Sequence, residues 1–496
     1  MNATHRTTYK TAILLLLLSI GTLFIHGYHP YSEDGEIYLP GVERMLNPAL
    51  FPEGQEFFQS HANMTLFPNL VSYSLRITHL PFETGLLLWH VGSIFMLLLG
   101  CWQLSRTCFG SVRAQWGSVL LIASLHSLPV AGTALYILDQ YLNPRNLAAF
   151  AAVFAVARTV ESKYVQAVLW VAAAAIVHPL MWTYTFCFCT LLVVMRWYES
   201  RTRVATEPMA KVSSFACLLP AIPLTQSSPA YHEAAKLHAY HYIQHWAWYE
   251  LVGLVAPIGL FFWFARVARL KAWTNVVRLC RAFIVYDIVF IVAALVVDLP
   301  ARFESLARLQ PLRSLHLLYV VMFVVMGGLL GEFVLKNRVW RWLLLFLPIC
   351  GGMYAGERAL FPASVTVEWP GRAAKNPWAQ AFVWARRNTA IGDVFAMDPY
   401  YMHIKGEDEI GFRCLAQRSR LADGVKDNGV VSMFPPLAER WLREVKAQSP
   451  WDQLGMADFE RLRREYGVSW VIVQQPGIVG LECPYANSVV RVCRTP

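Results

Sequence analysis

The sequence predicts an α-helical polytopic membrane protein that ends in a small soluble α/β domain. Hydrophobic residues make up 56% of the 496 positions and charged residues only 15%, a balance far from that of water-soluble proteins. Apolar stretches long enough to cross a bilayer, or nearly so, recur along residues 1–356. From residue 357 the composition changes to that of a globular domain, so we place a domain boundary there.

Eleven apolar stretches are candidates for membrane spans. Several are short or interrupted by proline, which membrane helices tolerate where neighbouring helices satisfy the freed backbone groups. We expect the first stretch to be a signal anchor, with a cleaved signal peptide as the alternative, because no small-residue cleavage motif follows it. The stretches lie at about 11–27, 83–104, 116–137, 146–160, 164–180, 181–197, 212–224, 249–265, 282–299, 314–335 and 340–355.

The distribution of cationic residues predicts which way the chain is oriented. If the N-terminus is cytoplasmic, the inner loops hold 18 Lys and Arg residues and the outer loops hold 7. This asymmetry predicts a multi-pass protein of the cell membrane with its C-terminal domain outside. Of the net charge of +10, only +2 belongs to residues 357–496, so orientation explains the basicity and we expect no nucleic-acid partner.

Residues 357–496 show the alternation of patterns that is typical of a small α/β domain. Helical patterns at about 377–388, 435–447 and 456–466 are interleaved with strand-like runs at 394–397, 468–473 and 489–493. The segment is long enough to bury a core of its own. Cys483 and Cys493 flank a stretch that could close a hairpin; on an oxidising side of the membrane they could form a disulfide, and the alternative is two free thiols.

The first long outer loop, 28–82, carries the most distinctive polar segment, in which Ser32 is followed by Glu33, Asp34, Gly35 and Glu36. A carboxylate near the lipid headgroups could take a proton from an acceptor hydroxyl or hold a divalent cation such as Mg or Mn, so Glu33 and Asp34 are candidate catalytic residues. Alternatively, Ser32 caps a helix whose first turn contains the acids. The loop also has aromatic residues that suit a membrane interface, namely Tyr28, Tyr31, Tyr38, Phe51, Phe57, Phe58, Phe67 and Tyr73.

Three arginines on the outer side are candidates for binding a lipid phosphate, because a guanidinium donates two parallel hydrogen bonds to phosphate oxygens. They are Arg145, Arg302 and Arg313. Arg145 could instead pair with Asp139. His178, at the outer end of a span and directly before a proline, could line a cavity. Alternatively, it is a simple hydrogen-bonded helix terminus.

Three further histidines, His238, His241 and His245, follow a helical spacing. They could contribute to a divalent metal site. The aromatic residues between them favour the other interpretation, an amphipathic helix at the membrane surface.

In this arrangement the chain resembles the GT-C class of membrane glycosyltransferases, which use polyprenyl-linked sugar donors. The resemblance rests on the position of Glu33 and Asp34 after the first span, on the segment 34–40, and on a C-terminal outer domain. It implies that Glu33 or Asp34 is the catalytic or metal-holding acid. The chain also resembles bacterial integral-membrane proteins of the same layout that have no assigned activity.

There is a second resemblance: residues 384–389 and 393–395 are similar to the start of the soluble domain of oligosaccharyltransferase catalytic subunits. Those enzymes carry the motif Trp-Trp-Asp-Tyr-Gly, where this chain has 396–401, Ala-Met-Asp-Pro-Tyr-Tyr. Protein N-glycosylation is therefore not expected.

These observations favour an inverting transferase that moves a sugar from a polyprenyl-phosphate donor to an acceptor on the outer face. The alternative is a non-catalytic envelope protein whose outer domain binds a partner through the segments 412–419 and 434–436, so whether the chain is an enzyme stays open. A transporter is disfavoured because charges within the spans are few and no repeated halves are found. The sugar, the acceptor, the metal and the oligomeric state cannot be inferred from the sequence.

Overall fold

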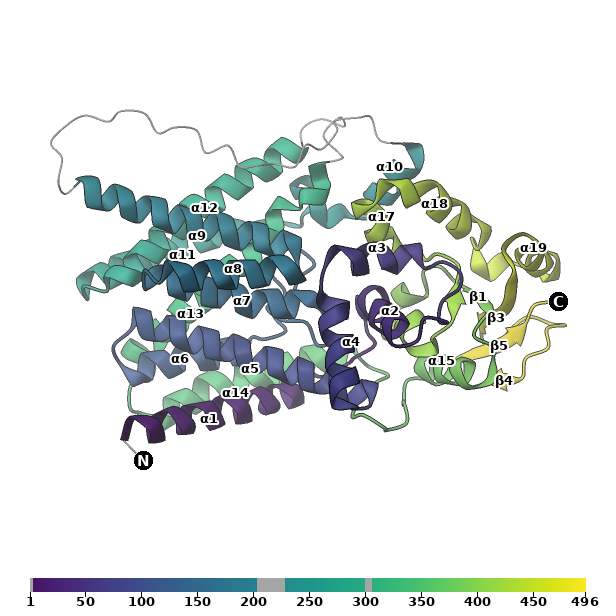
Figure 1. Ribbon diagram of the computed structural model, residues 1–496, viewed down its shortest axis with the longest axis horizontal. Coiled ribbons are helices and arrows are strands. Elements are labelled where there is room, and N and C mark those ends of the chain that lie inside the picture. Colours follow the sequence, from purple (N-terminus) through teal and green to yellow (C-terminus); the bar gives the residue numbers. More distant parts are fainter. Residues whose placement is uncertain (1–2, 203–227, 299–305) are drawn as a thin grey trace.

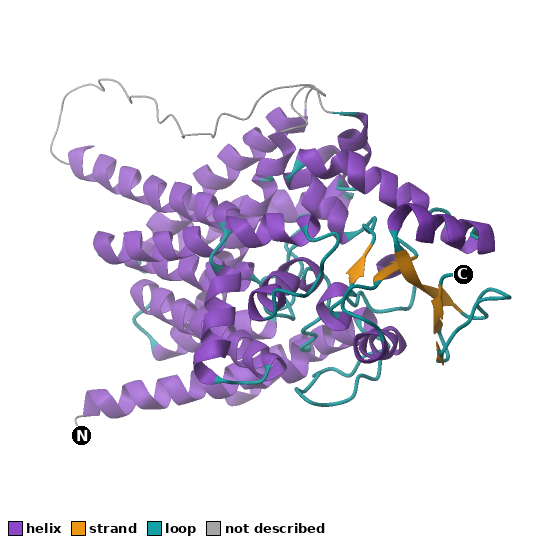
Figure 2. Ribbon diagram, turned by 45° about the vertical axis from the view of Figure 1, so that its right-hand side comes forward, coloured by secondary structure: helices purple, strands orange, loops and turns teal. Residues whose placement is uncertain are grey.

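The protein is described here by a computed structural model that covers residues 3–202, 228–298 and 306–496. Long helices run side by side along the longest axis, and a smaller region with a sheet caps one end of them (Figure 1). Figure 2 shows that the strands are confined to this C-terminal region. The chain is therefore a helical membrane protein with a small C-terminal α/β domain, as the sequence predicts.

Seven of the described helices are long and apolar enough to cross a membrane. Three shorter helices complete the bundle. Ten of the eleven predicted stretches thus contain helices, and the stretch 212–224 lies outside the described residues. The long helices are α1 (Ala3–His26), α5 (Phe82–Cys108), α9 (Pro179–Thr202), α11 (Trp248–Leu270), α12 (Thr274–Asp298), α13 (Leu315–Leu329, extended by the π-helical turn η5, Leu330–Leu335) and α14 (Val339–Leu360), and the shorter ones are α6 (Val112–Ser124), α7 (Pro144–Val160) and α8 (Tyr164–Val177).

The stretch 116–137 differs from the prediction, because its helix ends at Ser124. The rest of the stretch is a largely buried loop in which Pro129 bridges to Tyr136. Proline lacks the backbone N–H that a helix needs, and Ala131 and Ala134 adopt positive φ angles of 44° and 53°. Apolar composition alone does not distinguish such a loop from a span.

The N-terminus and the C-terminal domain lie at opposite ends of the bundle (Figure 1). The connections α5–α6, α7–α8 and α11–α12 lie at the N-terminal end. They carry the cations Arg106, Arg113, Arg158, Lys163 and Lys271, among others. Cationic residues are therefore concentrated at the N-terminal end of the bundle. The cytoplasmic placement of this basic end stays a prediction.

The C-terminal sheet has five strands in the order β2-β1-β3-β5-β4. β1 is parallel to β2 and β3, whereas β5 is antiparallel to β3 and β4. A disulfide joins Cys483 to Cys493, which lies in β5. The elements are α15 (Pro377–Asn388), β1 (Val394–Met397), α16 (Arg413–Ala416), β2 (Ser419–Arg420), α17 (Lys426–Met433), α18 (Ala438–Ala447), α19 (Met456–Tyr466), β3 (Val468–Gln474), β4 (Tyr485–Ala486) and β5 (Val490–Arg494), with the 3-10 turns η6 (Tyr401–His403), η7 (Pro435–Leu437) and η8 (Trp451–Gln453).

The loop 28–82 forms α2 (Gly35–Leu46), α3 (Glu56–Met64) and α4 (Phe67–Thr78), which lie between the long helices and the C-terminal sheet (Figure 1). The backbone of the acidic segment is joined to the C-terminal domain. Glu33 N–H donates to the Glu409 carbonyl at 2.9 Å, and Gly411 N–H donates to the Tyr31 carbonyl at 2.7 Å. The loop and the C-terminal domain consequently form one packed unit.

This packing corrects the interface role predicted for the loop's aromatic residues. Six of the eight are buried within the protein, because the C-terminal domain and the long helices cover them. Tyr38 is half-buried and Tyr73 is exposed. The buried six are Tyr28, Tyr31, Phe51, Phe57, Phe58 and Phe67.

The segment between α9 and α11 also differs from the prediction. Instead of one helix carrying the three histidines, its described part comprises α10 (Pro229–Lys236) and the single 3-10 turns η1 (Ala239–His241) and η2 (Ile243–His245). The last short turn of the bundle region is η4 (Pro311–Ser314), which precedes α13.

Candidate active site

A cavity of about 110 Å³ lies where the helical bundle meets the loop 28–82 and the C-terminal domain. Four of the predicted site residues line it: Asp34, Arg145, His178 and Arg313. Arg302 lies outside the described residues. The rest of the lining is Ile37, Tyr38, His61, Met64, Thr65, Pro144, Pro179, Leu180, Tyr240, Gln310, Gly429, Ser432 and Met433.

Helix ends bring these four side chains together. Asp34 directly precedes α2, and Arg145 lies in the first turn of α7, where Asn143 caps the helix by accepting from Asn146 N–H at 3.1 Å. His178 is the residue between α8 and α9, where Pro179 starts the second helix. Arg313 lies in η4. Prolines thus begin α7, α9 and η4, and these starts lie together with the start of α2 around the cavity.

Arg145 is the centre of an ion-pair chain on one wall of the cavity. Its Nη1 lies 2.7 Å from Asp34 Oδ2, and its Nε donates to Asp139 Oδ2 at 3.1 Å. The Tyr141 hydroxyl accepts from Asp34 N–H at 3.4 Å. The predicted pairing of Arg145 with Asp139 is therefore present together with the bond to Asp34, and it does not remove Arg145 from the site.

Lys426, the first residue of α17, is a site residue that the sequence interpretation missed. Its Nζ lies 3.6 Å from Glu33 Oε2, 3.7 Å from Asp34 Oδ1 and 3.4 Å from Glu409 Oε2. The C-terminal domain therefore supplies a cation to the acidic segment. No local spacing could have revealed its contact with Glu33 and Asp34, because nearly 400 residues separate Lys426 from them in the sequence.

The pKa values of the two neighbouring acids are shifted in opposite directions. Burial opposes ionisation of Asp34, but the charges of Arg145 and Lys426 outweigh it and lower its pKa well below the usual range. Burial raises the pKa of Glu33 to about 7 in spite of Lys426, and the negative charges of Glu409 and Asp34 add to the rise. Asp34 is thus the stronger acid of the two, whereas Glu33 exchanges a proton near neutral pH.

The alternative role of the acidic segment as a helix cap does not fit the geometry. Asp34, not Ser32, is the residue before α2, and its side chain makes no capping hydrogen bond. Within the described residues the Ser32 hydroxyl has no hydrogen-bond partner. The Asp34 carboxylate contacts cations and lines the cavity. Of its side-chain surface, 23% remains exposed.

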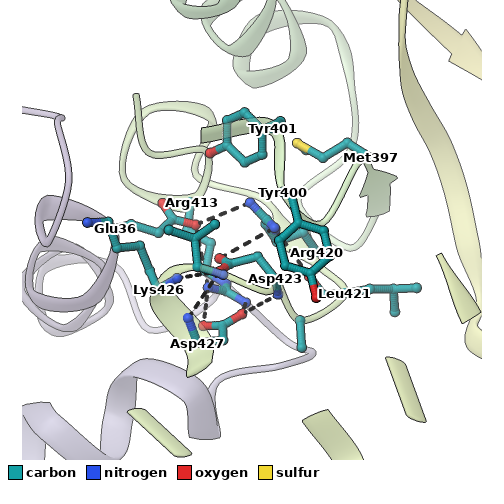
Figure 3. Close-up of polar contacts among 12 residues, drawn as sticks. Glu36, Met397, Tyr400, Tyr401, Arg413, Arg420, Leu421, Asp423, Lys426 and Asp427 are labelled. Carbon is teal, nitrogen blue, oxygen red and sulfur yellow. Dashed lines mark hydrogen bonds and ion pairs between the residues drawn. The ribbon is translucent and has the colours of Figure 1, made fainter. Parts of the chain in front are cut away.

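A second, fully buried ion cluster fixes the acidic segment to the C-terminal domain (Figure 3). Arg413 holds Asp427 through two hydrogen bonds of 2.8 and 2.7 Å, and its Nη1 lies 3.4 Å from Glu36 Oε1. Arg420 lies 3.9 Å from Glu36 and 3.4 Å from Asp423. Asp423 in turn accepts from the first backbone N–H groups of α17. The cluster therefore positions α17, and with it Lys426, against the acidic segment.

The donor groups at the cavity do not fit a divalent cation in this arrangement. The carboxylates of Asp34 and Glu33 are held by Arg145 and Lys426, so a metal would bring two more positive charges beside fixed cations. Among the described residues no group of three or more His, Cys, Asp or Glu side chains is arranged to hold a metal. His238 and His241 stack with ring centroids 5.1 Å apart.

No family model and no curated protein matches this chain. Its fold is similar to two solved structures of Archaeoglobus fulgidus oligosaccharyltransferase, the first of them described as AglB. One holds an inhibitory peptide and a dolichol-phosphate; its TM-score is 0.46 at 10% identity, over 94% of this chain and 69% of that chain. The other is tethered to an acceptor peptide containing the NVT sequon; its TM-score is 0.46 at 12% identity, with the same coverage. At this level of similarity, we base the proposed function on the residues of this chain.

Proposed function

We propose that the protein is an inverting glycosyltransferase that moves a sugar from a polyprenyl-phosphate donor to an acceptor on the outer face of the membrane. The observation that carries this proposal is the cavity itself. It joins a proton-accepting acid segment and arginines with aromatic rings at one end of a membrane bundle, and these are the groups that a phosphate-linked sugar requires.

Arg313 is the residue to which we assign the donor phosphate. Its guanidinium lies over the Tyr240 ring, 5.5 Å from the centroid. Within the described part of the chain its Nε has no hydrogen-bond partner, whereas Arg145 is occupied by Asp34 and Asp139. Arg145 then orients Asp34 and contributes positive charge, and His178 completes the wall.

In the reaction that we propose, Glu33 is the base; it is not itself among the residues that line the cavity, but it directly precedes Asp34, which is. The acceptor hydroxyl gives its proton to the Glu33 carboxylate while its oxygen attacks the anomeric carbon. The bond between that carbon and the phosphate oxygen breaks, and the electron pair leaves with the polyprenyl phosphate, whose charge Arg313 stabilises. A single displacement inverts the anomeric configuration.

The alternative of a non-catalytic partner-binding protein loses one of its two proposed surfaces. Phe412, Arg413, Ala416, Arg418 and Ser419 are all buried. They pack the C-terminal domain and hold the acidic segment, so they offer no exposed surface to a partner.

Binding of a polyprenyl monophosphate to the purified protein in nanodiscs tests the assignment of Arg313. A charge-assisted hydrogen bond contributes about 1.5–3 kcal/mol, so Arg313→Gln should weaken binding by about 10- to 100-fold. Arg308→Gln is the matched control, because Arg308 is on the same segment and does not line the cavity. Equal affinity of the two variants and the parent would remove Arg313 from the site.

A further inference from the structure

α4 runs across the bundle instead of along it (Figure 1). Its start is joined to the end of α8, where Leu66 N–H donates to the Ile176 carbonyl at 2.7 Å. Its later turns reach the start of α5, where Trp89 Nε1 donates to the Ser74 hydroxyl at 2.8 Å. α4 therefore lies at the level where the long helices end, on the side of the C-terminal domain.

α4 has two apolar faces, and only one of them is covered by protein. Phe67, Val71 and Leu75 are buried and follow a spacing of four residues. On another side of the helix, an outer stripe of exposed apolar residues follows the spacing i, i+4, i+7 and i+11. This outer stripe consists of Leu66, Leu70, Tyr73 and Ile77.

The outer stripe adjoins two apolar helices of the bundle that carry exposed apolar residues of their own. Leu66 adjoins Ile176, an exposed apolar residue at the end of α8, and beyond Ile77 the chain enters the apolar helix α5, whose Leu88 is exposed. Ile77 alone is 78% exposed. Contiguous exposed apolar patches mark contact surfaces, and a patch that continues the lipid-facing sides of membrane helices fits a bilayer.

Polar side chains at the edge of α4 fit the same location. The Arg76 guanidinium lies 5.9 Å from the centroid of the Tyr73 ring. Tyr and Arg suit the headgroup region, because an apolar stem reaches lipid while the polar end stays hydrated.

We infer that α4 is an interfacial helix whose outer stripe is embedded in the bilayer leaflet on the side of the C-terminal domain. This inference does not depend on the proposed transferase activity. Met64 and Thr65, which line the cavity, directly precede α4. The cavity therefore lies at the depth of the lipid headgroups, where a lipid-linked ligand would present its polar end.

Spin-label accessibility in nanodiscs that hold one copy of the protein tests this inference. A nitroxide at Ile77→Cys is compared with one at Val479→Cys, a 96% exposed position in the C-terminal domain, and with one at Leu169→Cys on the exposed side of α8. Oxygen concentrates in lipid and a nickel chelate stays in water. Label attached to native cysteines is measured on the parent protein and subtracted.

We expect the ratio of oxygen to nickel collisions at Ile77 to be at least about threefold higher than at Val479 and to approach that at Leu169. A ratio equal to that at Val479 would place the outer stripe in water. An immobile label that neither reagent reaches would mean that protein covers the stripe. Either result overturns the inference, and Leu70→Cys provides a second position should Ile77→Cys fail to fold.

Discussion

Removing the charge of Lys426 should shift the pH dependence of transfer to higher pH. The Lys426 ammonium lies within 3.4–3.7 Å of the Glu33, Asp34 and Glu409 carboxylates. An opposite charge this close lowers the pKa of a carboxyl by about 1–3 units. With Lys426 present the pKa of Glu33 is about 7, so in Lys426→Met it should rise to about 8–10.

The direction of this shift in the pH dependence follows from the proposed role of Glu33 as the base, because a base is active only when it is ionised. In the parent, the rate should rise as the pH increases through about 7. In Lys426→Met the ionised fraction of Glu33 at pH 7 falls from about one half to between about one tenth and one thousandth. The rate at pH 7 should therefore fall by about 5- to 500-fold, with recovery at high pH.

Initial rates of transfer from a polyprenyl-phosphate sugar between about pH 5.5 and 10 measure this shift. Lys426→Arg should keep the parent profile because it keeps the charge. Lys405→Met, at an exposed position of the same domain, is the matched control. A uniform loss of rate at every pH, with no displacement of the profile, would refute the electrostatic role of Lys426.

Three further predictions address the fold. Arg413→Met leaves buried carboxylates without their cation and should cost about 3–5 kcal/mol of stability, seen as a lower Tm in calorimetry, whereas Arg443→Met on the surface should leave Tm unchanged. Alkaline phosphatase fused after Pro496 should be active and a fluorescent protein fused there dark, and the reverse pattern would place the C-terminal domain in the cytoplasm. Cys483 and Cys493 should react with a thiol reagent only after reduction, and labelling of both in the oxidised protein would show that they are unpaired.

Hydropathy and local chemistry predicted much of this molecule. The spans are long apolar runs, and the alternation of helical and strand-like patterns after residue 357 indicates the C-terminal sheet. Charge or position at the end of a span indicates Asp34, Arg145, His178 and Arg313, and all four line one cavity. The bilayer restricts charged groups to the ends of helices, which is why residues at span ends lie close together; the roles assigned to these four stay predictions.

Contacts between distant segments could not be predicted in the same way. Lys426 and Arg413 are ordinary cations in the sequence, and only the docking of the C-terminal domain gives them carboxylate partners. The same docking buries Tyr28 and Phe67, which composition alone assigned to the membrane interface. Residues 125–137 are apolar but form a loop, in which Pro129 cannot donate a helical hydrogen bond and Ala131 and Ala134 adopt positive φ angles.

Transfer of a labelled sugar from a polyprenyl phosphate by the purified protein in nanodiscs tests the proposed function most directly. The parent should catalyse transfer with inversion, and Glu33→Gln should lose about 10²-fold or more in rate while keeping its Tm. Asp34→Asn should also lose activity, because Arg145 loses its partner at the cavity. Full activity of Glu33→Gln, or a folded parent that transfers no sugar from any polyprenyl-phosphate donor, would contradict the assignment of this cavity as a glycosyl-transfer site.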